Sequence, residues 1–129
     1  MASIRKKLTG RWRLVSYTAR PERGKEVYPL GAAAKGVLDY SREGHVSVHI
    51  MGERYFAYYG YYSVDEKACT VTHHLELCSD RNLAGASNLR QIALEGARLV
   101  LSGSMELDGK PHAIRVVWER EADQAANRR

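Results

Sequence analysis

The chain has 129 residues and a formal net charge of +5 at pH 7, a length that suits one domain with a substantial core. No apolar run approaches the ~20 residues of a membrane span, and the start Met-Ala-Ser-Ile-Arg-Lys-Lys is not followed by a signal-peptide core. The positive excess lies near the N-terminus, without any nucleic-acid-binding motif. We therefore expect a cytoplasmic protein with no membrane and no nucleic-acid partner.

From residue 36 onward the chain alternates between strand patterns and short turns. Residues 1–9 are a charged lead-in, for which we expect a short helix that plugs one end of the fold. Residues 18–35 form a long loop with a short strand at 26–28, and residues 121–129 form a polar, frayed tail. The strands expected, in chain order, are 10–17, 36–40, 44–50, 55–64, 69–77, 88–94, 99–105 and 112–120.

The hairpin formed by residues 55–64 and 69–77 contains the most informative pattern. Side chains alternate between the two faces of a strand, so one face of the second arm carries Val71, His73, Leu75 and Leu77. A histidine thus points inward among apolar neighbours. A two-residue turn at Glu66-Lys67 would place Gly60 opposite His73, leaving space beside the imidazole.

The inward faces of successive strands meet one another in one consistent register. Across the Gly96 turn the inward pairs are Leu94–Leu99, Ile92–Leu101 and Arg90–Gly103; across the Asp108-Gly109 turn they are Leu99–Trp118, Leu101–Val116 and Gly103–Ile114. No amphipathic helix is long enough to cover such a sheet, so the sheet must close on itself. We predict a single all-β domain over residues 1–129, an eight-stranded antiparallel up-and-down β-barrel.

Strand directions predict which end of this barrel is open. The loops 18–35, 51–54 and 79–87 fall at one end and form the rim of a cavity. The tight turns after strands 36–40, 55–64 and 88–94 fall at the other end, near Trp12 and Trp118.

A few inward positions are polar within a lining that is otherwise aliphatic or aromatic. These candidate ligand-binding residues are Ser16, Tyr40, Tyr58, Tyr62, His73 and Arg90. A buried guanidinium needs a partner, and the inward positions include no Asp or Glu. We expect a ligand carboxylate, enolate or phenolate to pair with Arg90. The alternative is a plugged barrel in which tyrosine hydroxyls and trapped waters satisfy Arg90 and His73.

No metal ion and no cofactor are expected. His45 and His49 lie four residues apart on a strand, about 13 Å at ~3.3 Å per residue, which is too far to share a metal. His74 points outward and is expected in solvent. Cys69 and Cys78 lie on one strand with opposite parity, so we expect plain thiols.

The first strand opens with Gly10-Arg11-Trp12, which is similar to the Gly-x-Trp signature of the lipocalin and fatty-acid-binding superfamily. In those barrels an arginine at the end of the last strand packs over the tryptophan, and Arg120 matches that role. More closely, the chain resembles the short intracellular lipocalin-like domain family of bacteria and fungi, over most of residues 8–120. The matching pieces are Gly10-x-Trp12-x-Leu14, Gly36-x-Leu38-x-Tyr40, Gly44-His45-Val46-Ser47, Gly60-x-Tyr62, Val71-x-His73-His74, Leu89-Arg90 and Trp118-Glu119-Arg120. The resemblance implies the barrel and a ligand cavity, and no particular reaction.

Two classes of function follow from these residues. The favoured one is binding of a small, largely hydrophobic molecule with a polar or anionic end. The alternative is a cofactor-free isomerase, cyclase or dehydratase of secondary metabolism, with His73 as general acid/base, Arg90 stabilising an oxyanion and a tyrosine such as Tyr62 donating a proton.

The outer face of strand 55–64 predicts self-association. It turns three tyrosines outward, Tyr55, Tyr59 and Tyr61. A row of aromatic residues with few charges is typical of an interface core, so we expect a homodimer packed through this face. The outward Val15 and Tyr17 of the first strand are expected to form a second such patch. The alternative is that the tyrosines lie flat on the barrel with their hydroxyls in water.

Overall fold

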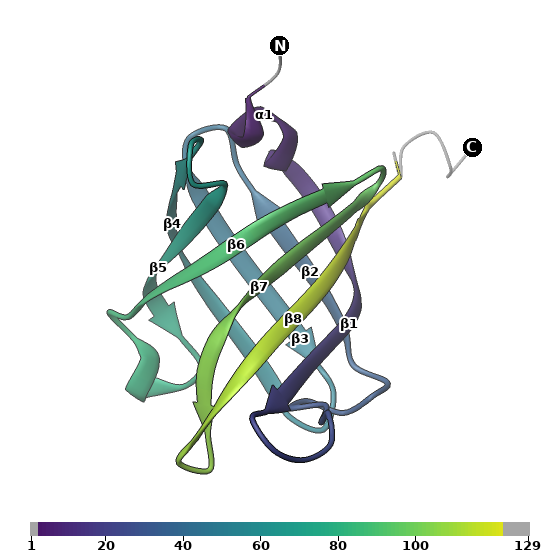
Figure 1. Ribbon diagram of the computed structural model, residues 1–129. Coiled ribbons are helices and arrows are strands. Elements are labelled where there is room, and N and C mark those ends of the chain that lie inside the picture. Colours follow the sequence, from purple (N-terminus) through teal and green to yellow (C-terminus); the bar gives the residue numbers. More distant parts are fainter. Residues whose placement is uncertain (1–2, 123–129) are drawn as a thin grey trace, which may run out of the picture.

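The computed structural model of the chain describes residues 3–122, which form strands, one short helix near the N-terminus and one 3₁₀ turn (Figure 1). In chain order the elements are α1 (Ile4–Leu8), β1 (Gly10–Pro21), β2 (Lys35–Tyr40), β3 (His45–Met51), β4 (Tyr55–Asp65), β5 (Thr70–Cys78), η1 (Arg81–Leu83), β6 (Ser87–Glu95), β7 (Arg98–Leu107) and β8 (Lys110–Arg120).

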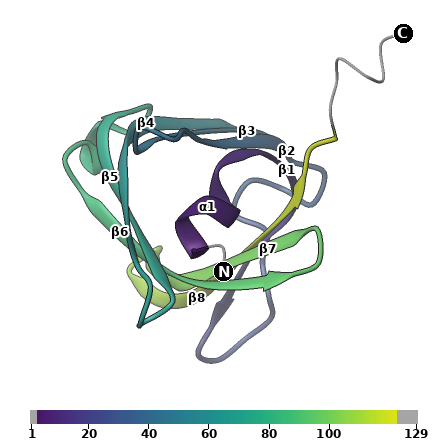
Figure 2. The same ribbon diagram turned by 90° about the horizontal axis from the view of Figure 1, so that it is seen from above.

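The strands form one closed antiparallel barrel in the order β1 to β8, and β8 pairs back onto β1. Seen from above, they make a ring with α1 inside its rim (Figure 2). This confirms the predicted eight-stranded up-and-down barrel. Closure gives every strand two neighbours along at least part of its length and turns one face of every strand toward the core. No helix among the described residues is long and apolar enough to cross a membrane.

The registers predicted from alternating hydrophobicity are confirmed on both sides of β7. Leu94 pairs with Leu99, and Leu99 in turn pairs with Trp118. Leu99 is fully buried and Trp118 is 2 % exposed. Burying one side chain of this size stabilises the fold by about 1.5–3 kcal/mol. A shift of the pairing by one residue would expose all the inward side chains of the strand and so remove this stabilisation at each of them.

The predicted register of the β4–β5 hairpin is wrong. Tyr62, and not Gly60, lies opposite His73. The loop comprises Glu66–Cys69, and its last residue has a left-handed backbone with φ 59°. The ladder also shifts register next to Gly60, where the backbone packs so closely on the carbonyl of His74 that a Cβ would collide with it. Gly60 therefore permits close strand approach rather than leaving space beside the imidazole. The same shift puts Leu77, which was expected inward, on the outer face, where it is 67 % exposed.

A bulge in β1 corrects a second expectation. The pairing with β8 shifts between Leu14 and Ser16, so the inward and outward sets exchange beyond that point. Tyr17 consequently lines the interior, and Ser16 does not. The second outer patch expected from Val15 and Tyr17 is therefore absent.

The helix α1 plugs one end of the barrel, as predicted. Leu8 is fully buried and its carbonyl accepts a hydrogen bond from Trp12 Nε1 at 2.9 Å. The Arg120 guanidinium lies 4.0 Å from the centre of the Trp12 ring and donates to the carbonyls of Lys7 and Thr9. This confirms the contact between Trp12 and Arg120. Residues 123–129 of the expected frayed tail lie outside the described residues.

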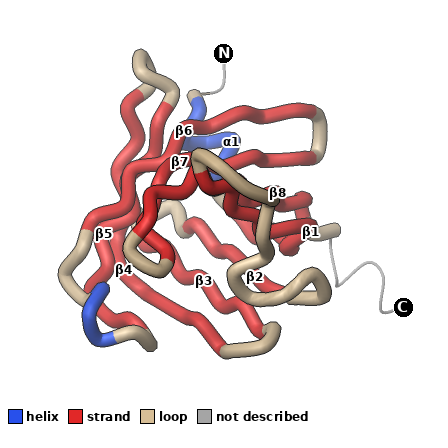
Figure 3. The backbone as a smooth tube through the Cα atoms, turned by 60° about the horizontal axis from the view of Figure 1, so that its bottom comes forward, coloured by secondary structure: helices blue, strands red, loops and turns tan. Residues whose placement is uncertain are grey.

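The opposite end of the barrel is open, and in Figure 3 its loops come forward. A hollow there is lined by residues from three connections, among them Leu30, Arg54 and Arg81. This agrees with the predicted position of the rim. The short strand expected at 26–28 is reduced to one bridge, between Ala19 and Val27.

Candidate functional site

A cavity of about 290 Å³ lies inside the barrel. Its walls are mainly apolar, with a smaller set of polar groups. The apolar side chains include Leu38, Val48, Ile50, Phe56, Leu101, Ile114 and Val116, and the polar ones are Tyr17, Tyr58, His73, Asn88, Arg90, Ser104 and Glu106. The volume is at the lower limit of small-molecule sites, ~300–1,000 Å³. A compact organic molecule fits it.

His73 is the centre of a buried hydrogen-bonded chain. Its Nε2 lies 2.6 Å from the hydroxyl of Tyr40 and its Nδ1 lies 2.6 Å from the hydroxyl of Tyr58. The imidazole is 2 % exposed, and burial lowers its pKa to about 3, with the nearby charge of Arg90 acting in the same direction. His73 is therefore neutral at physiological pH, with one N–H and one lone pair.

The surroundings of the two tyrosines determine which group donates and which accepts in each of these two hydrogen bonds. Tyr40 is 2 % exposed and its hydroxyl contacts His73 away from the cavity lining, so its proton must go to Nε2. Nδ1 then carries the hydrogen and donates it to Tyr58. The hydroxyl proton of Tyr58, which lines the cavity, is left to donate into it. The buried histidine thus presents Tyr58 as a hydrogen-bond donor to whatever occupies the barrel.

Arg90 is the cationic group of this lining. It is half-buried, and its Nη1 donates to the carbonyl of Leu89 at 2.9 Å. Burial lowers its pKa, while the neighbouring hydroxyls of Tyr58 and Tyr17 act in the opposite direction. None of the ion pairs among residues 3–122 involves Arg90. The guanidinium therefore stands in the wall of the cavity with hydrogen-bonding capacity left over.

A further donor belongs to Trp118. Its side chain lines the cavity and is almost fully buried, yet its indole N–H has no hydrogen-bond partner within the described part of the chain. Leaving such a group unsatisfied costs about 1–3 kcal/mol. Because this nitrogen exposes almost no surface even to the cavity, the missing hydrogen bond is a cost within the core and not a contact offered to a ligand.

The wall of the barrel is open on one side, between β6 and β7. The two strands pair from the turn only as far as Gln91 and Ser102, and beyond that point their ribbons diverge (Figure 1). A surface groove runs along this divergence and shares Asn88, Arg90 and Ser104 with the cavity. Arg90 consequently lies where the interior meets the side opening.

The structure brings together four of the predicted site residues, namely Tyr40, Tyr58, His73 and Arg90. Tyr62 is buried, but its hydroxyl donates to the carbonyl of Ser41 at 2.8 Å, outside the cavity lining.

Sequence reasoning missed several lining residues, among them Tyr17, Asn88 and Trp118. It also missed Glu106, which corrects the expectation that the lining contains no Asp or Glu. Asn88 shares the inward parity of Arg90, which was sufficient to find it. Trp118 was recognised as inward and treated only as core. The position of Tyr17 depends on the bulge in β1, for which the sequence carries no signal.

Metal-binding residues do not cluster in the described part of the chain, where no group of three or more His, Cys, Asp and Glu side chains could hold an ion. Cys69 and Cys78 are thiols, as predicted.

Comparison with known families now identifies the fold. The sequence description of the lipocalin-like domain matches two overlapping stretches, residues 9–54 and 50–121, which together cover most of the chain. The chain belongs to the lipocalin-like domain family. This fold is consistent with small-molecule binding in general.

Solved structures agree with the lipocalin-like barrel. A crystal structure of an uncharacterized protein from Bacteroides eggerthii DSM 20697 is similar, with a TM-score of 0.53 and 14 % sequence identity. The match covers 88 % of this chain and 99 % of that chain, so the likeness concerns the whole barrel and shows the fold alone. A comparison with curated proteins found no match.

Proposed function

We propose that this lipocalin-like barrel binds a small, largely hydrophobic molecule whose anionic or strongly accepting end pairs with Arg90. One observation carries the proposal: a partly buried guanidinium stands in the cavity wall and forms no ion pair, although the carboxylate of Glu106 also belongs to the lining. The apolar walls suit the body of such a molecule. A carboxylate, enolate or phenolate is the matching end group.

The hydrogen-bond polarity of the site supports an acceptor as the ligand's polar end. Tyr58 donates into the cavity because its oxygen already accepts from His73, and Arg90 offers further donors in the same lining. A neutral ligand that offers donors alone would leave these two groups unsatisfied. The position of Arg90 beside the side opening supports placing the anionic end there, toward the groove between β6 and β7.

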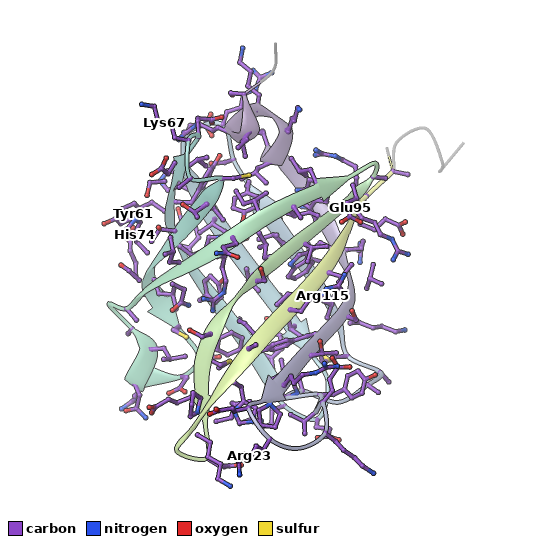
Figure 4. All side chains as sticks on the ribbon, in the orientation of Figure 1. Arg23, Tyr61, Lys67, His74, Glu95 and Arg115 are labelled. Atoms are coloured by element: carbon purple, nitrogen blue, oxygen red, sulfur yellow. The ribbon has the colours of Figure 1, made fainter. Side chains whose placement is uncertain are left out.

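Calorimetry with a naphthoic acid and its methyl ester tests this proposal. The ionised acid is expected to bind more tightly than the ester, and Arg90→Ala is expected to weaken binding of the acid by more than about 1.5 kcal/mol, roughly tenfold. Arg115→Ala is the matched control, because Arg115 is exposed on the outside of β8 (Figure 4). Equal affinity for acid and ester, or an equal loss in the control, would rule out Arg90 as an anion clamp.

The alternative function, a cofactor-free enzyme with His73 as acid/base, has less support. Both imidazole nitrogens are hydrogen-bonded to tyrosines, and a pKa lowered to about 3 makes His73 a weak base at neutral pH. Turnover of a candidate substrate that His73→Ala abolishes while binding persists would favour the enzyme.

A further inference from the structure

The outer surface of β3 to β6 differs from the rest of the barrel in being apolar and aromatic. Residues 3–122 expose nine large hydrophobic side chains, and six of them lie on this surface. We call these six the aromatic face: Met51, Tyr55, Tyr59, Tyr61, Leu77 and Leu89. The sequence of β3 contains no Asp, Glu, Lys or Arg, and β4 contains none before Asp65. Such a surface is typical of an interface core.

The tyrosines of the aromatic face are each placed against a histidine, which orders their rings before any partner arrives. The pairs are Tyr55 with His49, Tyr59 with His45, and Tyr61 with His74. The ring of Tyr61 stacks on that of His74 at 4.5 Å, outside β4 and β5 (Figure 4). His74 was expected in solvent, but it is half-buried and hydrogen-bonded to the hydroxyls of Ser63 and Ser87. Rings that are already fixed lose little conformational freedom on binding.

The ion pairs of the barrel lie on the opposite half. Those of the described residues involve β1, β2, β7, β8 and the segments next to them, and include Arg11–Asp39 and Arg98–Glu119. A contact between two aromatic faces therefore leaves these ion pairs in water and buries none of them.

We propose that two copies of the chain associate through their aromatic faces. Tyrosine hydroxyls and imidazoles each donate and accept hydrogen bonds, so the face is complementary to itself, as a two-fold interface requires. Glu76, which is exposed on β5 next to Leu77, is the charged side chain at this face.

The size of the face is sufficient for such a contact. At ~3.3 Å per residue the row from Tyr55 to Ser63 is about 26 Å long, and four strands about 4.8 Å apart make a face about 19 Å wide. Each copy thus contributes roughly 500 Å², and the pair roughly 1,000 Å², the smallest area expected of a specific interface.

Sedimentation and light scattering of the full chain at micromolar concentration test the proposal. The unmodified chain is expected at twice the mass of one chain, and the double variant Tyr59→Glu, Tyr61→Glu at the mass of one. Val15→Glu is the matched control, because Val15 is 41 % exposed on β1 and Tyr59 is 40 % exposed on β4. This control is expected to remain a dimer.

Circular dichroism verifies that each variant keeps the barrel. A monomeric mass for the unmodified chain overturns the proposal. So does a dimer that survives the double substitution, or one that the Val15→Glu control also dissociates. The mass is measured without ligand, so the outcome does not depend on whether Arg90 binds an anion, although Leu89 of the aromatic face also lines the groove beside Arg90.

Discussion

Acid is expected to destabilise this barrel through His73. The pKa of His73 is lowered to about 3 in the folded chain, whereas an unperturbed histidine titrates near ~6.5. Between these values the unfolded chain holds a proton that the folded chain does not. The contribution of His73 to stability is therefore complete above about pH 6.5 and is lost as the pH falls toward 3. At about pH 5 the loss relative to neutral pH is about 2 kcal/mol, set by proton uptake in the unfolded chain.

Urea unfolding at neutral pH and at about pH 5 measures this loss, with the fluorescence of the buried Trp12 and Trp118 as the signal. The decisive quantity is the difference between the two losses, that of the unmodified chain and that of His73→Gln. The other histidines are present in both proteins, so their contributions to the pH dependence cancel in this difference. Val71→Ala, on the same strand and equally devoid of solvent contact, is the control for a general loss of stability.

The expected result is that the unmodified chain and Val71→Ala each lose about 2 kcal/mol more than His73→Gln does between the two pH values. Equal losses in the unmodified chain and in His73→Gln would refute the reasoning, because they would show that His73 takes up its proton without unfolding. A smaller but definite difference would mean that the folded pKa lies nearer the ordinary value.

Two further predictions concern stability, and urea unfolding measures both. Tyr40→Phe removes the hydroxyl that donates to the buried Nε2 of His73 and is expected to lower the free energy of unfolding by about 1–3 kcal/mol. Tyr58→Phe is expected to lower it less, because water in the cavity can replace the Tyr58 hydroxyl. Equal losses in the two variants would contradict the direction of the hydrogen-bonded chain. Arg120→Lys loses the planar stacking on Trp12 and is expected to lower the free energy of unfolding by about 1–2 kcal/mol. A change of less than about 0.5 kcal/mol would show that a positive charge at this position is sufficient.

The fold could be predicted wherever alternation and turn chemistry agree. The Gly96 turn fixes the pairing of Leu94 with Leu99, and every later inward pair follows from it. The failures lie where one strand carries an extra residue. The bulge in β1 reverses the parity of Tyr17, and the Asp65 carboxylate accepts two loop amides, which stabilises a longer loop than the predicted turn. Neither feature changes the hydrophobic pattern, so the pattern could not reveal it.

The site was predictable residue by residue but not as a network. Parity along single strands placed His73 and Arg90 inside, and neighbouring strands placed them together. Tyr40 lies on β2 and His73 on β5, and they meet only across the barrel interior. The distance between such groups depends on the curvature of the whole sheet, which no local pattern encodes.

The seam between β1 and β8 has a consequence for how the protein is made. Thr9 and Arg120, which are joined across this seam, lie 111 residues apart in the sequence. Contacts of such long range form late, because the intervening chain must be ordered first. During synthesis β1 and the most recent strand are both open edges, able to pair with other chains. The nascent protein is thus an open sheet during nearly all of its synthesis, and the barrel closes only when β8 becomes available to pair with β1.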